Sequence, residues 1–150
     1  PIPVVSAAMG TTAVRRAAAL GAGILLDSLS SVERCRELTD TYRAAGGTEP
    51  CVLIRRAWIG EPFRAHVDAQ VDVYRGYASP AAQGHWGDDE LIAHDEPAAV
   101  AGQLAAVVDA AGADALNLRL HVPGIDPEAA REQLARLGDE VLGPLREALR

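Results

Sequence analysis

The chain has 150 residues, of which 49% are hydrophobic, 23% charged and only 4% aromatic. This composition excludes a disordered chain, a collagen-like repeat and a disulfide-rich scaffold. With 14 basic and 21 acidic residues the net charge is −7, which argues against nucleic acid or an anionic membrane as a partner. All the basic residues are arginines, so no lysine can form a Schiff base.

The chain carries no sign of export or membrane insertion. No apolar run approaches the roughly 18 residues that span a membrane, and no signal peptide is recognisable. Cys35 and Cys51 have the spacing of neither a metal site nor a redox motif, so we expect both to be buried in a cytoplasmic protein. Because Pro1 stands first, we expect a processed product or a piece of a longer protein.

Strands and helices are predicted to alternate. Ile2 to Ala8 is short, apolar and rich in β-branched residues at its start, which predicts a buried parallel strand. After a turn at residues 9–12, apolar positions recur at helical spacing up to Leu20, which we expect to face inward. Ile24 to Leu26 is predicted to form a second buried strand that ends at Asp27.

The middle of the chain continues the alternation. Ser30 and Glu33 have the S-x-x-E spacing of a capping box, which predicts the start of a second helix. Cys51 to Trp58 predicts a third strand, and Pro62 suits the first turn of a third helix. The stretch from Ser79 to His94 is irregular, and long connections of this kind in compact domains are often functional.

The last part is predicted to place a strand between two helices. Asp95 is expected to cap a helix with Pro97 in its first turn. Ala115 to Val122 alternates as a fourth strand, and Asp126 opens a final helix with Leu134 among its inward positions. The Pro144 ring is expected to bend or fray the end of that helix.

Strands that alternate with helices indicate an α/β fold with a parallel sheet. Four β/α units suffice for an open sheet, and they are also half of a (β/α)8 TIM barrel of about 250 residues. We expect residues 1–150 to form a single domain with a loop insertion at 79–95. The inner layer of a barrel would take side chains that we assign to Val4, Leu25, Ile54 and Leu118.

The turn after the first strand is a candidate phosphate site. Met9 and Gly10 precede a helix whose free N–H groups and positive dipole end attract anions, and Thr11 and Thr12 add hydroxyl donors. The turn is neither a G-x-G-x-x-G motif nor a P-loop. A tight turn with a threonine cap is the alternative reading of the same residues.

Arg55, Trp86 and His121 are further candidates for contacts with a substrate or a phosphate. Arg55 is one of two arginines at the end of the third strand that point to opposite faces, so either could hold an oxyanion or face a helix. Trp86 could cover a flat ring or anchor its loop on the core. His121 lies near the end of the fourth strand. No ligand spacing for zinc is present, so we predict no metal, and catalytic residues stay unassigned.

Four segments resemble the C-terminal half of luciferase-like monooxygenases, the bacterial luciferase superfamily of flavin- or deazaflavin-dependent oxidoreductases. They are PIPVVSAAMGTTAVRRAAALGAGILLDSL, ELTDTYRAAGG, VLIRRAWIG and AGADALNLRLHVPGIDPEAAREQLARLGDEVLGPLREAL, and together they cover nearly the whole chain. The resemblance implies strands five to eight of a (β/α)8 barrel. It also implies FMN or 8-hydroxy-5-deazaflavin as the cofactor and a small organic molecule as the substrate.

The resemblance also implies roles for individual residues. The turn formed by Ala8, Met9, Gly10 and Thr11 would contact the flavin phosphate, and Asp27 and Ser28 would border the pocket. Many relatives have serine or glycine in place of Met9, and backbone contacts would survive that difference. The missing strands carry much of the flavin and substrate site in this family, so the chain alone is expected to be inactive without an N-terminal half-barrel or a second copy.

Two alternatives stay open. The opening strand and helix also resemble those of nitronate monooxygenase-type FMN barrels, although a glycine-rich phosphate segment and a catalytic histidine of that family are not found. A non-catalytic barrel homologue or an assembly subunit is the other alternative. Bound flavin would distinguish the enzymes from the non-catalytic protein.

Overall fold

The computed structural model describes residues 2–87 and 91–150. The chain divides into two compact units. The first unit comprises Pro1–Arg55, His85–Glu90 and Ala106–Asn117. The second comprises Arg56–Gly84, Leu91–Ala105 and Leu118–Arg150.

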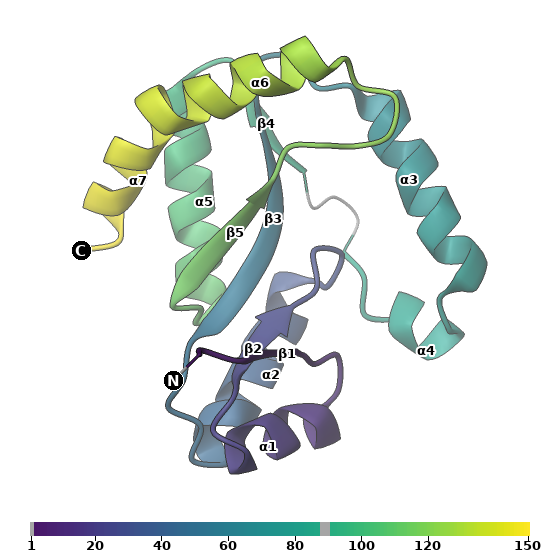
Figure 1. Ribbon diagram of the computed structural model, residues 1–150, viewed down its shortest axis with the longest axis vertical. Helices are drawn as coiled ribbons and strands as arrows, with labels where there is room; N and C mark the ends of the chain where they lie inside the picture. Colours follow the sequence, from purple (N-terminus) through teal and green to yellow (C-terminus); the bar gives the residue numbers. More distant parts are fainter. Residues whose placement is uncertain (1, 88–90) are drawn as a thin grey trace. The chain divides into compact units, whose positions relative to one another are not determined.

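Strands and helices alternate along the chain, and β1 with β2, β2 with β3 and β3 with β4 pair in parallel, as predicted (Figure 1). The sheet runs in the order β1-β2-β3-β4, and β5 pairs with β3. The elements are β1 (Val5–Ala7), α1 (Thr11–Ala19), β2 (Gly23–Leu26), α2 (Val32–Ala44), β3 (Cys51–Ile59), α3 (Arg64–Tyr77), α4 (Pro80–Gln83), β4 (Leu91–His94), α5 (Pro97–Ala111), β5 (Ala115–Arg119), α6 (Pro127–Arg136), a π-helical turn (Leu137–Val141) and α7 (Leu142–Ala148).

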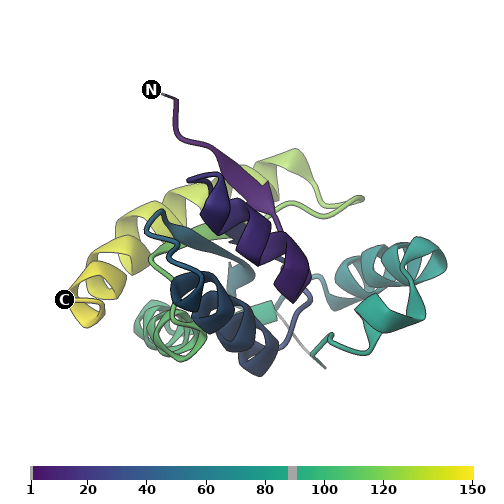
Figure 2. The same cartoon turned by 90° about the horizontal axis from the view of Figure 1, so that it is seen from below.

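The core of the first unit lies between the sheet and its helices. Helices α1 and α2 pack side by side (Figure 2). Ile24 and Leu26 of β2 point toward them, as does Leu53 of β3, and all three are fully buried. The hydroxyl of Tyr42 in α2 donates to the Ala22 carbonyl at 2.9 Å, which satisfies a polar group inside this core.

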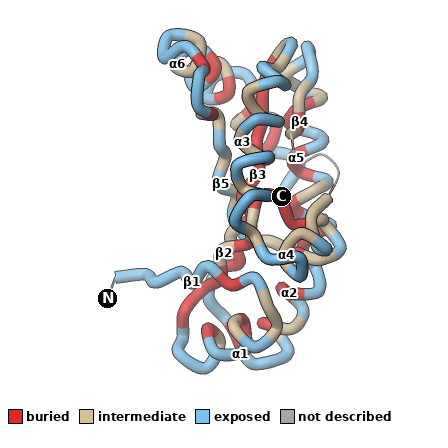
Figure 3. The backbone as a smooth tube through the Cα atoms, turned by 90° about the vertical axis from the view of Figure 1, so that its right-hand side faces the viewer, coloured by how far each residue is buried: buried red, intermediate tan, exposed pale blue. Residues whose placement is uncertain are grey.

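The prediction of a buried first strand over residues 2–8 is wrong in length and in burial. Only Val5–Ala7 forms β1, and Val4 is 63% exposed. Among the described residues β1 pairs with β2 alone, so its other edge has no neighbour, and residues 2–4 before it are exposed (Figure 3). Leu20, expected to face inward, lies just beyond the end of α1 and is 77% exposed.

Two of the four residues predicted for the inner layer of a barrel do not lie on that face of the sheet. Leu25 and Ile54 do lie on the face opposite the helices, since their neighbours point into the helical core. Ala7 shares the register position of Leu25, so Ala7 rather than Val4 lies on that face. Leu118 has the parity of Leu116, which packs on the helical core, and is therefore assigned to the wrong face.

Two of the predicted helix caps move by one residue, and one is confirmed. Ser31, not Ser30, caps α2, because its hydroxyl oxygen accepts from the Arg34 amide at 3.2 Å. Helix α5 begins after Glu96, whose carbonyl accepts the first intrahelical bond, so Asp95 lies one residue too early. Asp126 caps α6 as predicted, accepting from the amide of the second helical residue at 2.7 Å.

The stretch from Ser79 to His94 is more regular than predicted. Ser79 caps the short helix α4, where Pro80 occupies the first turn. Residues 91–94 form β4, which extends the sheet beside the second half of β3. Residues 88–90 of this stretch lie outside the described part of the chain. The regular pieces form because a capped turn and an added strand satisfy backbone groups that a loop would leave to water.

The final helical region packs through one buried amide. The Gln133 side chain of α6 accepts from the Ile59 amide at 2.9 Å and donates to the Ile59 carbonyl at 2.8 Å. It therefore satisfies both backbone groups of the last residue of β3. Leu134, predicted to face inward, is exposed and Gln133 is buried in its stead. The bend expected at Pro144 is a π-helical turn just before it, since proline lacks an amide and its ring displaces the carbonyl four residues earlier.

Candidate functional site

The turn between β1 and α1 leaves backbone donors uncapped. Gly10 is the N-cap residue of α1, and no side chain accepts a hydrogen bond there among the described residues. The first amides of a helix have no intrahelical acceptor, so this turn presents donors at the positive end of a helix dipole. A Cβ at Gly10 would meet nothing within 4 Å, which leaves room for a ligand to approach the backbone.

Arg34 lies beside this turn, and the sequence analysis did not single it out. Its Nη2 donates to the Met9 carbonyl at 3.1 Å, and its Nη1 pairs with Glu37 at 2.5 Å. The Arg34 side chain is only 12% exposed, and its buried Nε has no partner among the described residues. A cation is therefore fixed next to the uncapped amides. The sequence signal that could have indicated Arg34 is its position in the first turn of the helix that follows β2, because β2 is the strand next to β1.

Arg55 faces the helices and ties β3 to the connection between β2 and α2. It is 1% exposed, and its guanidinium donates to the carbonyls of Ile54 at 2.8 Å, Ser30 at 3.1 Å and Asp27 at 3.4 Å. Ser28 in the same connection is buried. The structure thus brings Asp27 and Arg55 together, and it favours the helix-facing alternative for this arginine.

Trp86 is held against the same connection. Ser30 and Trp86 form an isolated antiparallel bridge, the Ser31 amide donates to the His85 carbonyl at 3.0 Å, and Gly87 donates to the Leu29 carbonyl at 2.9 Å. The indole Nε1 is buried without a partner among the described residues. This arrangement favours the anchoring alternative for Trp86.

His121 belongs to the second unit and lies beyond the end of β5. It lines an open groove of about 520 Å³ together with residues of α3 and β5. The other residues assigned to the site from sequence lie in the first unit. Within the described ranges no three His, Cys, Asp or Glu side chains cluster as metal ligands.

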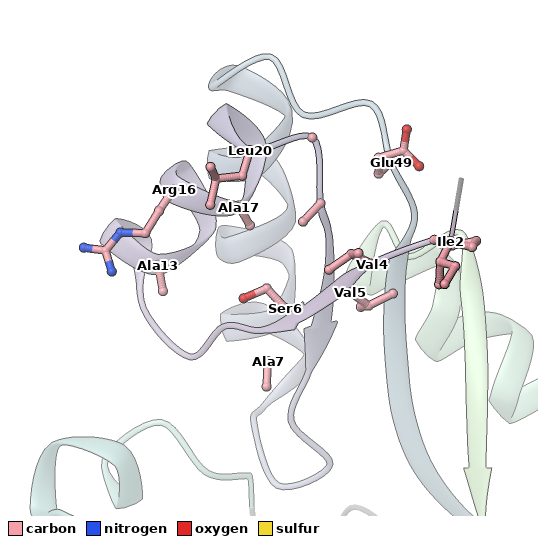
Figure 4. Close-up of a pocket in the computed structure, with 13 residues that line it drawn as sticks. Ile2, Val4, Val5, Ser6, Ala7, Ala13, Arg16, Ala17, Leu20 and Glu49 are labelled. Carbon is pink, nitrogen blue, oxygen red and sulfur yellow. The ribbon is translucent and has the colours of Figure 1, made fainter.

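A cavity of about 890 Å³ runs along the uncovered edge of β1 (Figure 4). Val4 and Val5 line it from the strand side, and Ala17 and Leu20 line it from α1. Among the described residues, Arg16 and Glu49 are the charged ones that line it. The residues assigned to the phosphate turn from sequence do not contribute to it.

Both cysteines are free and buried, as expected. Burial raises the pKa of the Cys51 thiol to about 11, so this thiol stays protonated at neutral pH. The Cys35 sulfur contacts the Nη2 of Arg55 at 3.8 Å inside the first unit.

Comparison with known proteins gives a fold relationship. The chain matches no protein-family model and no curated protein sequence. Among solved structures it is similar to the monooxygenase RslO1 from Streptomyces bottropensis, at 16% identity and a TM-score of 0.65, over 94% of this chain and 47% of that one. It is also similar to apo-MsnO8, at 19% identity and a TM-score of 0.54, over 96% and 49%.

The EDTA monooxygenase EmoA from Chelativorans sp. BNC1 matches at 18% identity and a TM-score of 0.57, over 98% of this chain and 47% of that one. The chain therefore has the α/β fold of about half a luciferase-like monooxygenase, and it spans about half the length of the solved structures it matches. No helix in the described ranges has the length and apolar character needed to cross a membrane.

Proposed function

We propose that the chain is part of a flavin- or deazaflavin-dependent monooxygenase that acts on a small organic substrate. The observation that carries the proposal is the uncapped turn at Gly10 beside Arg34, in a chain with the fold of half a luciferase-like monooxygenase. When bound, the flavin would supply the redox chemistry that amino-acid side chains lack.

The residues of the turn suit the phosphate of such a cofactor. Small residues allow close approach to the backbone, and the first amides of α1 donate to an anion without a side chain in the way. The Arg34 guanidinium, which already contacts the Met9 carbonyl, adds a charge-assisted hydrogen bond to a phosphate oxygen after a small movement. FMN and a phosphorylated derivative of 8-hydroxy-5-deazaflavin are equal candidates for the group that carries this phosphate.

We propose further that the uncovered edge of β1 pairs with another half-barrel. That partner is an N-terminal half of the same protein or a second copy of the chain. The cavity along the uncovered edge of β1 and the half-length match support this pairing, because a closed barrel leaves no strand edge unpaired.

The test of the phosphate site is a titration with FMN followed by the backbone amide NMR shifts of Thr11 and Thr12, with riboflavin as the phosphate-free control. FMN should shift these amides and riboflavin should not. Arg34→Gln and Gly10→Val should each weaken FMN binding about tenfold or more, the scale of lost hydrogen bonds to a charged group.

Arg36→Gln is the matched control, because Arg36 lies on the same helix and pairs with Asp40 on the surface. Gly10 has φ −144°, an extended conformation that valine adopts readily, so Gly10→Val should fold normally. Equal shifts with FMN and riboflavin, or unchanged affinity in both variants, would remove the phosphate site. No binding of either flavin by the chain together with its partner half-barrel would favour the non-catalytic alternative.

A further inference from the structure

A second polar site lies in the second unit, where α3 faces the end of β5. The open groove of about 520 Å³ there takes its polar lining from Gln70, Tyr74, Arg119 and His121, and its apolar lining from Leu118 and Leu120. None of the described residues that line it is acidic. Hydrogen-bond donors and positive charge thus gather around an apolar floor.

The buried arginine Arg56 fixes the orientation of Gln70. Its Nη2 donates to the Gln70 Oε1 at 2.6 Å. A guanidinium carries only donors, so the amide oxygen must face it and the NH2 group must face away. That NH2 group has no acceptor among the described residues, which leaves two N–H donors for a ligand in the groove.

Arg119 supplies the forked donor of the site. Its side chain is exposed, and across residues 2–87 and 91–150 it has neither a hydrogen-bond nor an ion-pair partner. Arg119 also borders a small, apolar cavity together with Arg56 and Trp58. A planar guanidinium matches a carboxylate through two parallel hydrogen bonds, and the lack of acidic side chains among the described lining residues favours its attraction for an anion.

We propose that this groove binds the carboxylate of a small organic acid, held by Arg119 and the Gln70 amide, with the body of the acid on Tyr74 and the two leucines. Identifying this acid as the substrate rests on the proposed monooxygenase function, whereas the binding itself does not. The residues of the groove belong to the second unit, whereas the turn proposed for the flavin phosphate belongs to the first.

The test is calorimetric titration of the purified chain with benzoate, with the neutral isostere benzamide as the ligand control. Benzoate should bind and benzamide should not. Arg119→Gln should weaken benzoate binding at least tenfold. Arg131→Gln is the matched control, because Arg131 is an exposed arginine of the same unit outside the groove, and it should leave the affinity unchanged.

Gln70→Glu is the second variant. A glutamate keeps an oxygen for Arg56, so the unit should fold, but it replaces the amide donors by a negative charge that repels a carboxylate. This variant should abolish benzoate binding while the circular dichroism spectrum stays unchanged.

Inorganic phosphate and FMN distinguish the source of the anion. Binding of phosphate without benzoate, lost in Arg119→Gln, would overturn the carboxylate assignment in favour of a phosphate site. Equal benzoate affinity in the chain and in Arg119→Gln, or no benzoate binding at all, would overturn the site. FMN shifts at the Thr11 amide do not depend on Arg119, so failure here is distinguishable from failure of the proposed function.

Discussion

Cys51 and Asp114 exchange two hydrogen bonds that hold the start of β3 to the connection before β5. The Cys51 amide donates to the Asp114 Oδ2 at 2.7 Å, and the Asp114 amide donates to the Cys51 carbonyl at 2.9 Å. The same carboxylate oxygen pairs with Arg43 of α2 at 2.5 Å. One side chain therefore joins a helix, a strand and a connecting segment within the first unit.

Removing this carboxylate should destabilise the chain. Asp114→Ala leaves the Cys51 amide without its acceptor, which costs about 1–3 kcal/mol in the free energy of unfolding. The partly exposed ion pair of Arg43 with Asp114 contributes only about 0–1 kcal/mol, and Arg43→Ala should cost more than that because its Nη1 also donates to the Gly47 and Glu49 carbonyls. Urea unfolding followed by circular dichroism measures both. The exposed Asp68→Ala is the control, and an equal loss in all three variants would contradict this account.

The Cys51 thiol should make stability fall at high pH. Its pKa is raised from 9.0 to about 11 by burial, so the unfolded state loses the proton first. Between pH 9 and 11 the unfolded state binds fewer protons, and the free energy of unfolding therefore decreases as pH rises. Burial also raises the pKa of Tyr42, so the measurement is the difference between the chain and Cys51→Ala in urea at pH 8 and pH 10. An identical pH dependence in the two proteins would refute the assignment.

The cap of α2 should depend on Ser31 and not on its neighbour. Ser31→Ala should cost about 1 kcal/mol, the usual value for loss of a serine N-cap. Ser30→Ala is the matched control, because no hydrogen bond of the Ser30 hydroxyl supports the helix end within the described residues. Thermal unfolding compares the two. A larger loss of stability in Ser30→Ala than in Ser31→Ala would instead support the capping box predicted from the sequence, with Ser30 as the cap.

Glu33 gives the same cap a dependence on pH. Hydrogen bonds from its own backbone amide and from the Ser31 hydroxyl lower the pKa of Glu33 below 4.5. A carboxyl with a lowered folded pKa stabilises the fold above its ordinary pKa, and that contribution is lost as pH falls through the folded value. Glu33→Gln should remove this part of the acid sensitivity. Unfolding curves at pH 6 and pH 3 check it, and an unchanged difference between them would contradict the assignment.

The edge of β1 should govern self-association if the chain pairs with a partner there. Val4 lines the cavity along β1 and is 63% exposed. Val4→Lys puts a charge on an apolar edge and should shift sedimentation toward the monomer over a concentration series. Val73→Lys is the matched control, since Val73 is 64% exposed on α3 and lies outside that cavity. A monomer at every concentration in the unaltered chain would exclude pairing of two copies.

The order of elements could be predicted because apolar runs and turn glycines are local signals. Gly60, for example, follows β3 with φ +98°, a conformation that glycine adopts without strain. Strand β4 escaped prediction because four residues between polar flanks give too short a pattern, and it forms only where β3 offers an edge.

The candidate site was less accessible to sequence reasoning. The contact between Arg34 and Met9 spans 25 positions, and the orientation of Gln70 depends on Arg56, which lies 14 positions earlier. Contacts of this kind are set by tertiary packing, which the spacing of residue types does not encode. The alternation in β5 does predict that Arg119 and Leu118 lie on opposite faces of the sheet. The face predicted for Leu118 was nevertheless the wrong one.

The π-helical turn at Leu137–Val141 has a consequence for the register of the C-terminal helices. Gln133, Leu137, Val141 and Leu145 are all buried although they are four residues apart. At 3.6 residues per turn, each step of four drifts by about 40° around a helix, and three steps would carry the last side chain toward solvent. The wider turn absorbs this drift and keeps one continuous buried line. Deletion of one residue inside the turn would restore α-helical winding and still leave the following side chains on the buried line, because spacings of four, three and four residues bring an α-helix back to within about 20° of the same face.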